Sequence, residues 1–84
     1  MFGECEICLK WRDLEKHHVY GAGKRMVSEK YGAVVFICRE CHDDLHHRHP
    51  SQYLWLKKDF QRRLMAENEW DVYDFIRVFG RSYL

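Results

Sequence analysis

The residues of this sequence that could do chemistry are its cysteines and histidines, and their spacing suits metal ions. Two Cys-x2-Cys pairs are separated by residues 9–37, and each pair can present two thiolates to one tetrahedral zinc ion. Two such pairs complete a closed site, so we predict a structural Zn²⁺ with four sulfur ligands. The predicted ligands are Cys5, Cys8, Cys38 and Cys41. The spacer exceeds the roughly 15–20 residues of a plain zinc ribbon, which leaves room for a hairpin.

A thioredoxin-like redox pair and a disulfide framework are the alternative interpretations of these cysteines. No βαβ pattern surrounds either pair, which argues against the redox alternative. The sequence has no apolar run long enough for a signal peptide or a membrane span, so we expect a cytoplasmic protein without a membrane partner. In that reducing compartment, paired cysteines bind metal more often than they form disulfides.

Four histidines form a second group. His17 and His18 are adjacent and precede a glycine-rich stretch, whereas His42 directly follows the last cysteine and His46 comes four residues later. Residues i and i+4 share one face of a helix, while adjacent strand residues point to opposite sides. We therefore predict that one histidine of the adjacent pair joins His42 and His46 around an open catalytic metal site. The other is then free to take a proton from water. His47 and His49 are interpreted as surface residues near a helix end.

These groups must be positioned by an α+β fold. The β-branched and aromatic pattern predicts two short antiparallel strands, at about 16–20 and 33–37, with a loop between them. A helix is expected from Arg39 until Pro50 stops it. Two further helices should follow, the first capped by Ser51 and the second ended by Gly80, with apolar stripes that pack on the first half. We predict one domain over 1–84, with a metal-binding core at 1–49 and a helical extension at 50–84.

The combination CxxC…HH…CxxCHxxxH over residues 5–49 resembles the HNH endonuclease superfamily, the ββα-metal nucleases, and is most similar to small phage- and prophage-encoded members. The resemblance implies a small ββα-metal core that hydrolyses DNA phosphodiester bonds with low sequence specificity. Carried over by position, it implies that His18 is the general base and that the four cysteines bind the structural zinc. The implied ligands of the catalytic ion are His17, His42 and His46. The family's middle Asn or His has no counterpart, since the only asparagine is Asn68.

The expected cofactors and partners follow from these residues. An imidazole site suits Mn²⁺, Ni²⁺ or Zn²⁺ better than Mg²⁺. The expected partner is double-stranded DNA, with Lys24 and Arg25 contacting phosphates, although both are equally compatible with plain surface charge. A homodimer or a phage protein partner is also compatible with the sequence. Basic and acidic residues number 14 and 13, so binding driven by a strong net positive charge is excluded. The alternative function is a non-catalytic zinc-knuckle module that binds DNA or protein.

Overall fold

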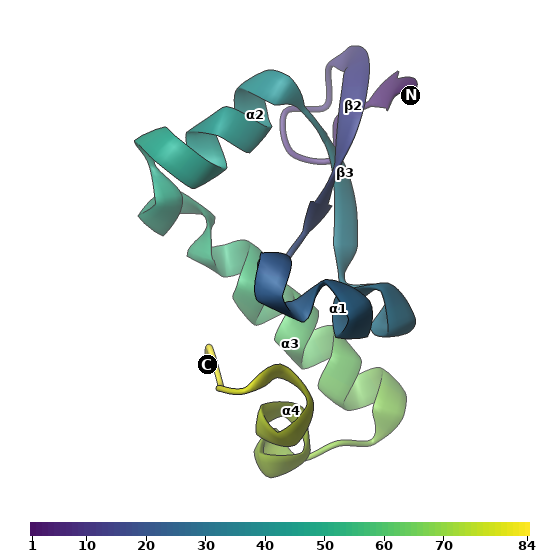
Figure 1. Cartoon of the computed structure of the whole chain (residues 1–84), viewed down its shortest axis with the longest axis vertical. Helices are drawn as coiled ribbons and strands as arrows, with labels where there is room; N and C mark the ends of the chain where they lie inside the picture. The colour runs from purple at the N-terminus through teal and green to yellow at the C-terminus, as the bar shows by residue number, and fades with distance from the viewer.

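The chain forms an elongated α+β structure in which a small sheet lies at one end with the helix over Arg39–Asp43 beside it, and the C-terminal helices extend to the other end (Figure 1). The computed structural model describes residues 1–84 and measures 37 × 23 × 20 Å. Its sheet is antiparallel, with the strand order β1–β2–β3. The strands are β1 (Phe2–Glu4), β2 (Trp11–His18) and β3 (Val34–Cys38). The prediction of an α+β fold is thereby confirmed.

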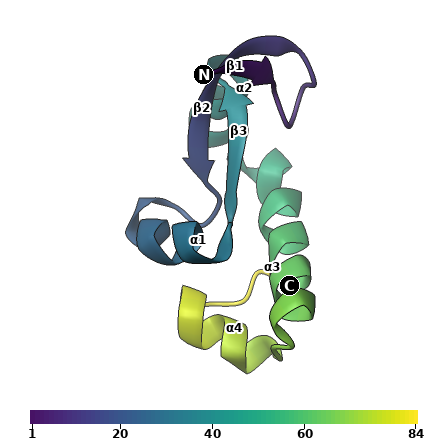
Figure 2. The same ribbon diagram turned by 90° about the vertical axis from the view of Figure 1, so that its right-hand side faces the viewer.

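Four α-helices complete the fold. They are α1 (Arg25–Tyr31), α2 (Arg39–Asp43), α3 (Leu54–Asn68) and α4 (Val72–Phe79). Helix α1 lies in the connection between β2 and β3, and α2 follows β3 directly. Figure 2 shows α3 running beside the end of the hairpin and α4 at the pole opposite the N-terminus. None of the helices combines the length and the apolar character needed to cross a lipid bilayer.

The predicted hairpin is present, but its strands have different bounds. β2 begins at Trp11 instead of near residue 16, and it pairs with β3 so that His17 lies opposite Val35. Val19 and Tyr20, which lie inside the predicted strand, instead follow β2 and are buried in the core. The strand therefore ends at His18 because the next two side chains both turn inward, which an alternating strand would not allow.

The loop expected between the strands is largely helical. A short 3-10 turn, Ala22–Lys24, leads into α1, and Gly32 ends that helix with a φ of 74°. Glycine adopts this left-handed conformation without the strain a Cβ would cause. The prediction of a loop was thus wrong for residues 22–31.

The predicted helix from Arg39 to Pro50 is also only partly α-helical. α2 ends at Asp43, and the chain continues as one π-helical stretch, Asp44–Arg48. Ser51 is not the cap of the next helix, because it lies in a 3-10 turn and α3 begins at Leu54. π-helical insertions are common at functional sites.

A single buried apolar cluster joins the two halves of the chain. The stripes predicted on the last two helices supply its C-terminal part, with Phe75 and Phe79 of α4 almost fully buried. Tyr20 from the hairpin packs against both of these rings, at centroid distances of 5.5 and 4.7 Å. Gly80 ends α4 as predicted, with a φ of 93°. The helical extension therefore packs against the segment that directly follows the two adjacent histidines.

Candidate metal centres

The four cysteines converge on one point. Cys5 and Cys8 come from the turn after β1, Cys38 ends β3, and Cys41 lies in α2; their sulfur atoms all lie within 4.8 Å of one another. The Sγ atoms of Cys8 and Cys38 are 3.8 Å apart. Sulfur atoms bound at about 2.3 Å to a tetrahedral zinc ion are separated from one another by about 3.8 Å. The separation of the Cys8 and Cys38 sulfurs therefore fits a shared zinc ion. The cluster can therefore hold a structural metal ion such as zinc.

The surroundings of the cysteines also favour a cation. Burial raises the pKa of the Cys5 thiol, but three backbone N–H groups that donate to its sulfur outweigh this and lower the pKa to about 6. These amides belong to Ile7, Cys8 and Cys38, at 3.4–3.5 Å. In contrast, burial and the neighbouring thiols raise the pKa of Cys41. A divalent ion would compensate the charge of closely spaced thiolates.

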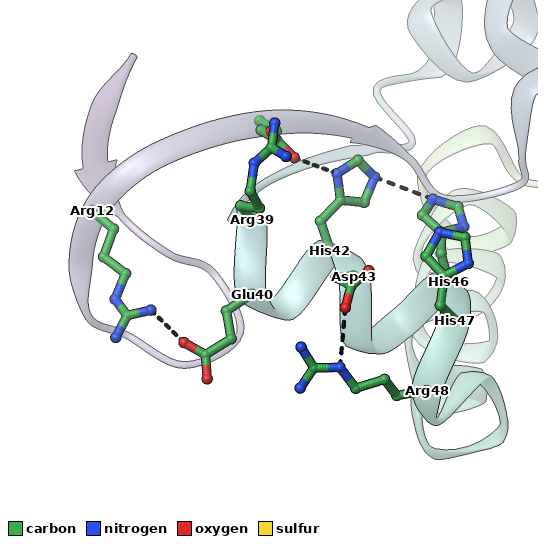
Figure 3. Close-up of a pocket in the computed structure, with 9 residues that line it drawn as sticks. Arg12, Arg39, Glu40, His42, Asp43, His46, His47 and Arg48 are labelled. Atoms are coloured by element: carbon green, nitrogen blue, oxygen red, sulfur yellow. Dashed lines mark hydrogen bonds and ion pairs between the residues drawn. The ribbon is translucent and has the colours of Figure 1, made fainter.

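Three histidines form a second cluster. Their ligand nitrogens also lie within 4.8 Å of one another, and their three ring centroids are separated by 5.2, 5.2 and 4.8 Å. The members are His17 from β2, His42 from α2 and His46 from the π-helical stretch. The Nε2 atoms of His42 and His46 are 3.2 Å apart, and Figure 3 shows the two rings facing each other. A tetrahedral ion at about 2.0–2.1 Å from each nitrogen requires a separation of about 3.3 Å.

A carboxylate orients one of these rings. Nδ1 of His42 lies 2.8 Å from Oε1 of Glu15, whose other oxygen pairs with Arg39 at 3.1 Å. The hydrogen bond to His42, followed by the charge of Arg39, lowers the pKa of Glu15. An ionised carboxylate only accepts, so Nδ1 of His42 carries the proton and Nε2 keeps its lone pair for a metal. This carboxylate–histidine arrangement is typical of metal sites.

The other two rings are kept neutral. Burial, together with the nearby His42 and His46, lowers the pKa of His17 to about 4. Burial also lowers the pKa of His46. Because only the neutral imidazole has a nitrogen lone pair to offer, both rings are in the metal-binding protonation state at neutral pH.

His18 lies on the opposite side of β2 from His17 but borders the same cavity. This cavity, which we call the four-histidine hollow, has a volume of about 220 Å³. It is lined by Lys16, His17, His18, Gly21, Ala22, Arg25, His42 and His46. A histidine outside the metal cluster thus borders the same cavity as the three rings that could bind an ion.

The two predicted DNA-contacting residues differ in their placement. Arg25 is exposed and lines the four-histidine hollow. Lys24 instead directs its ammonium group toward Gly80, where a Cβ built on the glycine would lie 3.3 Å from Nζ. The end of α4 has unpaired carbonyl oxygens that attract such a cation. Of the pair, only Arg25 is placed beside the histidine cluster.

The family models, curated proteins and solved structures compared with this chain include no match. His47 is exposed, and His49 pairs with Asp44 at 2.8 Å, outside the metal cluster.

A second, wider hollow shares His42 and His46 with the four-histidine hollow, and Figure 3 shows the residues that line it. It has a volume of about 620 Å³, and no apolar residue lines it. Its three arginines are each paired with a carboxylate. The pairs are Arg12–Glu40 at 2.6 Å, Arg39–Glu15 at 3.1 Å and Arg48–Asp43 at 3.0 Å. This hollow is therefore polar but not a free positive surface.

Sequence reasoning missed two acidic residues next to the histidines. Glu15 contacts His42, and Glu29 of α1 contacts His18 with Oε1 at 3.0 Å from Nε2. Glu15 was accessible to prediction, since it precedes His17 by two positions and such residues share one face of a strand. Glu29 had no comparable signal, because the helix that carries it was expected to be a loop.

Proposed function

We propose that this protein is a metal-dependent endonuclease of the HNH type that hydrolyses phosphodiester bonds in double-stranded DNA. The observation that carries the proposal is the four-histidine hollow: three imidazoles that can share an ion, a fourth imidazole and an arginine all border one small open space. A module that only binds DNA has no need of such an arrangement. The structural zinc, bound by sulfur alone, would fix β1 and β2 relative to α2.

In the proposed reaction His18 accepts a proton from a water molecule, and the resulting hydroxide attacks the phosphorus in line. The P–O3′ bond breaks, the departing oxygen takes a proton from solvent, and the products carry 5′-phosphate and 3′-hydroxyl ends. Arg25 contacts a non-bridging phosphate oxygen. His17, His42 and His46 would hold the catalytic ion, which supplies positive charge to neutralise the phosphate and the leaving oxygen.

The metal preference tests this proposal. Imidazole nitrogens bind Mn²⁺ and Ni²⁺ better than the hard ion Mg²⁺, which prefers oxygen ligands. We therefore expect supercoiled plasmid to be nicked faster with Mn²⁺ or Ni²⁺ than with Mg²⁺ at equal concentration. Gel quantification of open-circular DNA measures the rates, and end-labelling identifies the 5′-phosphate. A preparation that favours Mg²⁺ would contradict ligation by three histidines. A preparation inactive with every divalent ion would favour the alternative, a zinc-knuckle binding module.

Glu15→Ala tests how His42 is held. Without the carboxylate His42 loses its preferred orientation and tautomer, and such losses weaken metal binding by about 10- to 100-fold. We expect the Kd for Mn²⁺, measured by titration of the zinc-loaded protein, to rise by this factor while the zinc content stays at about one ion per chain. Glu67→Ala is the matched control, because Glu67 is exposed on α3 and outside both clusters. An unchanged Kd in Glu15→Ala would refute the orienting role.

A further inference from the structure

Glu29 is held against the proposed base by two contacts from the same face of β2. Its Oε1 atom lies 3.0 Å from Nε2 of His18 and 3.0 Å from Nζ of Lys16. Lys16 and His18 are two residues apart in β2, so their side chains project to the same side, away from His17. The His18 side chain is only 15% exposed, which restricts its ring.

Helix α1 is anchored in a way that keeps Glu29 in place. Ser28, the neighbour of Glu29, is fully buried, and its carbonyl oxygen accepts from the N–H of Ala33 at 2.8 Å. Gly32 ends the helix and returns the chain to β3. The helix is thus fixed at Ser28 and at Gly32, before and after Glu29. The Glu29 carboxylate is therefore held near His18 by an ordered helix.

The contact with Glu29 determines which ring nitrogen of His18 can accept a proton. The hydrogen bonds from Lys16 and His18 lower the pKa of Glu29, so the group is an ionised carboxylate that only accepts. Nε2 of His18 must therefore carry the shared proton, and in the neutral ring this leaves the lone pair on Nδ1.

We propose that Glu29 is a positioning residue that fixes His18 in its Nε2–H form, so that Nδ1 is the atom that accepts the proton from water. This inference rests on the proposed function for its catalytic part. When Nδ1 takes the proton, the ring becomes an imidazolium, and the Glu29 carboxylate stabilises the positive charge through the unbroken hydrogen bond. The same division of labour between a carboxylate and a histidine operates in serine-protease triads, with the two ring nitrogens exchanged.

Nitrogen NMR tests the positioning without any need for activity. In the zinc-loaded protein with ¹⁵N-labelled histidine, at a pH of about 8 where an ordinary imidazole is neutral, the two ring nitrogens of His18 should have well-separated shifts of a single tautomer. Glu29→Gln should keep this separation, because the amide oxygen still accepts from Nε2–H. Glu29→Ala should move the two shifts toward each other as tautomers mix. Shifts of His18 that are indifferent to Glu29→Ala overturn the proposal.

Plasmid nicking with saturating Mn²⁺ tests the catalytic consequence. We expect Glu29→Ala to lower kcat by about 10- to 100-fold with little change in KM, because the lost interaction strengthens only when His18 becomes charged. Glu29→Gln should fall between the alanine variant and the wild type, since it orients the ring but has no charge. Glu67→Ala should match the wild type. An unchanged kcat in zinc-loaded Glu29→Ala overturns the catalytic role of Glu29. A wild type that nicks no DNA overturns the proposed function alone, since the nitrogen shifts still decide whether Glu29 positions His18.

Discussion

Removal of the structural zinc is expected to unfold the whole chain at room temperature. Only 16 of the 84 residues are buried, so the apolar core of this small domain is modest. A zinc ion held by the four cysteines would tie the turn after β1 to the junction between β3 and α2, and structural zinc sites contribute about 10–16 kcal/mol of apparent binding energy in small domains. Since a single apolar cluster includes residues of both halves, the helical extension should unfold together with the hairpin.

Circular dichroism during chelation, and of Cys41→Ser, measures this effect. The serine side chain has nearly the same size as cysteine but is a poor zinc ligand, so the variant should lose the ion and its cooperative thermal transition. His17→Ala should keep about one zinc per chain, because the structural site uses sulfur alone. A zinc-free protein that retains the native near-ultraviolet spectrum and melts cooperatively would show that the cluster has no structural role.

The parts of the site that could be predicted from sequence are those set by local spacing. Two cysteines three positions apart, and two histidines four positions apart in one continuous helical stretch, are neighbours through local geometry alone. The hairpin then brings the N-terminal cysteines and histidines close to those of the following helical stretch, and its pattern of apolar residues allowed the hairpin to be predicted. The convergence of His17 on His42 needed only these elements, even though the strands and the helix have other bounds than predicted.

The contacts that could not be predicted depend on tertiary structure. Glu29 reaches His18 only because residues 25–31 fold as a helix, and the flanking glycines obscured that short amphipathic segment. Gly32 proved to be the stop signal of this helix rather than a break within a loop. Lys24 and Arg25 are adjacent in sequence, yet a turn of the chain sends one toward Gly80 and the other to the hollow. The positive charge of the two residues alone does not predict where each side chain points.

The second large effect is expected from His18→Ala. In the proposed reaction this ring is the one group that takes the proton from water, and a general base contributes about 10²- to 10⁴-fold to a rate. The variant should therefore lose DNA nicking by this factor. Its binding of Mn²⁺ should persist, because His18 is not a member of the three-histidine cluster. Its zinc content should also be unchanged, since the sulfur cluster lies elsewhere.

The most direct measurement of the central claim compares the wild type, His18→Ala and His47→Ala on supercoiled plasmid with saturating Mn²⁺, each shown to hold about one zinc ion. His47 is exposed and outside the cluster, so its variant controls for the loss of a histidine as such. We predict that the wild type and His47→Ala convert plasmid to the open-circular form at the same rate while His18→Ala is about 10²- to 10⁴-fold slower. Equal nicking by all three proteins would show that His18 is not the base, and a wild type that leaves the plasmid intact would contradict the proposed nuclease activity itself.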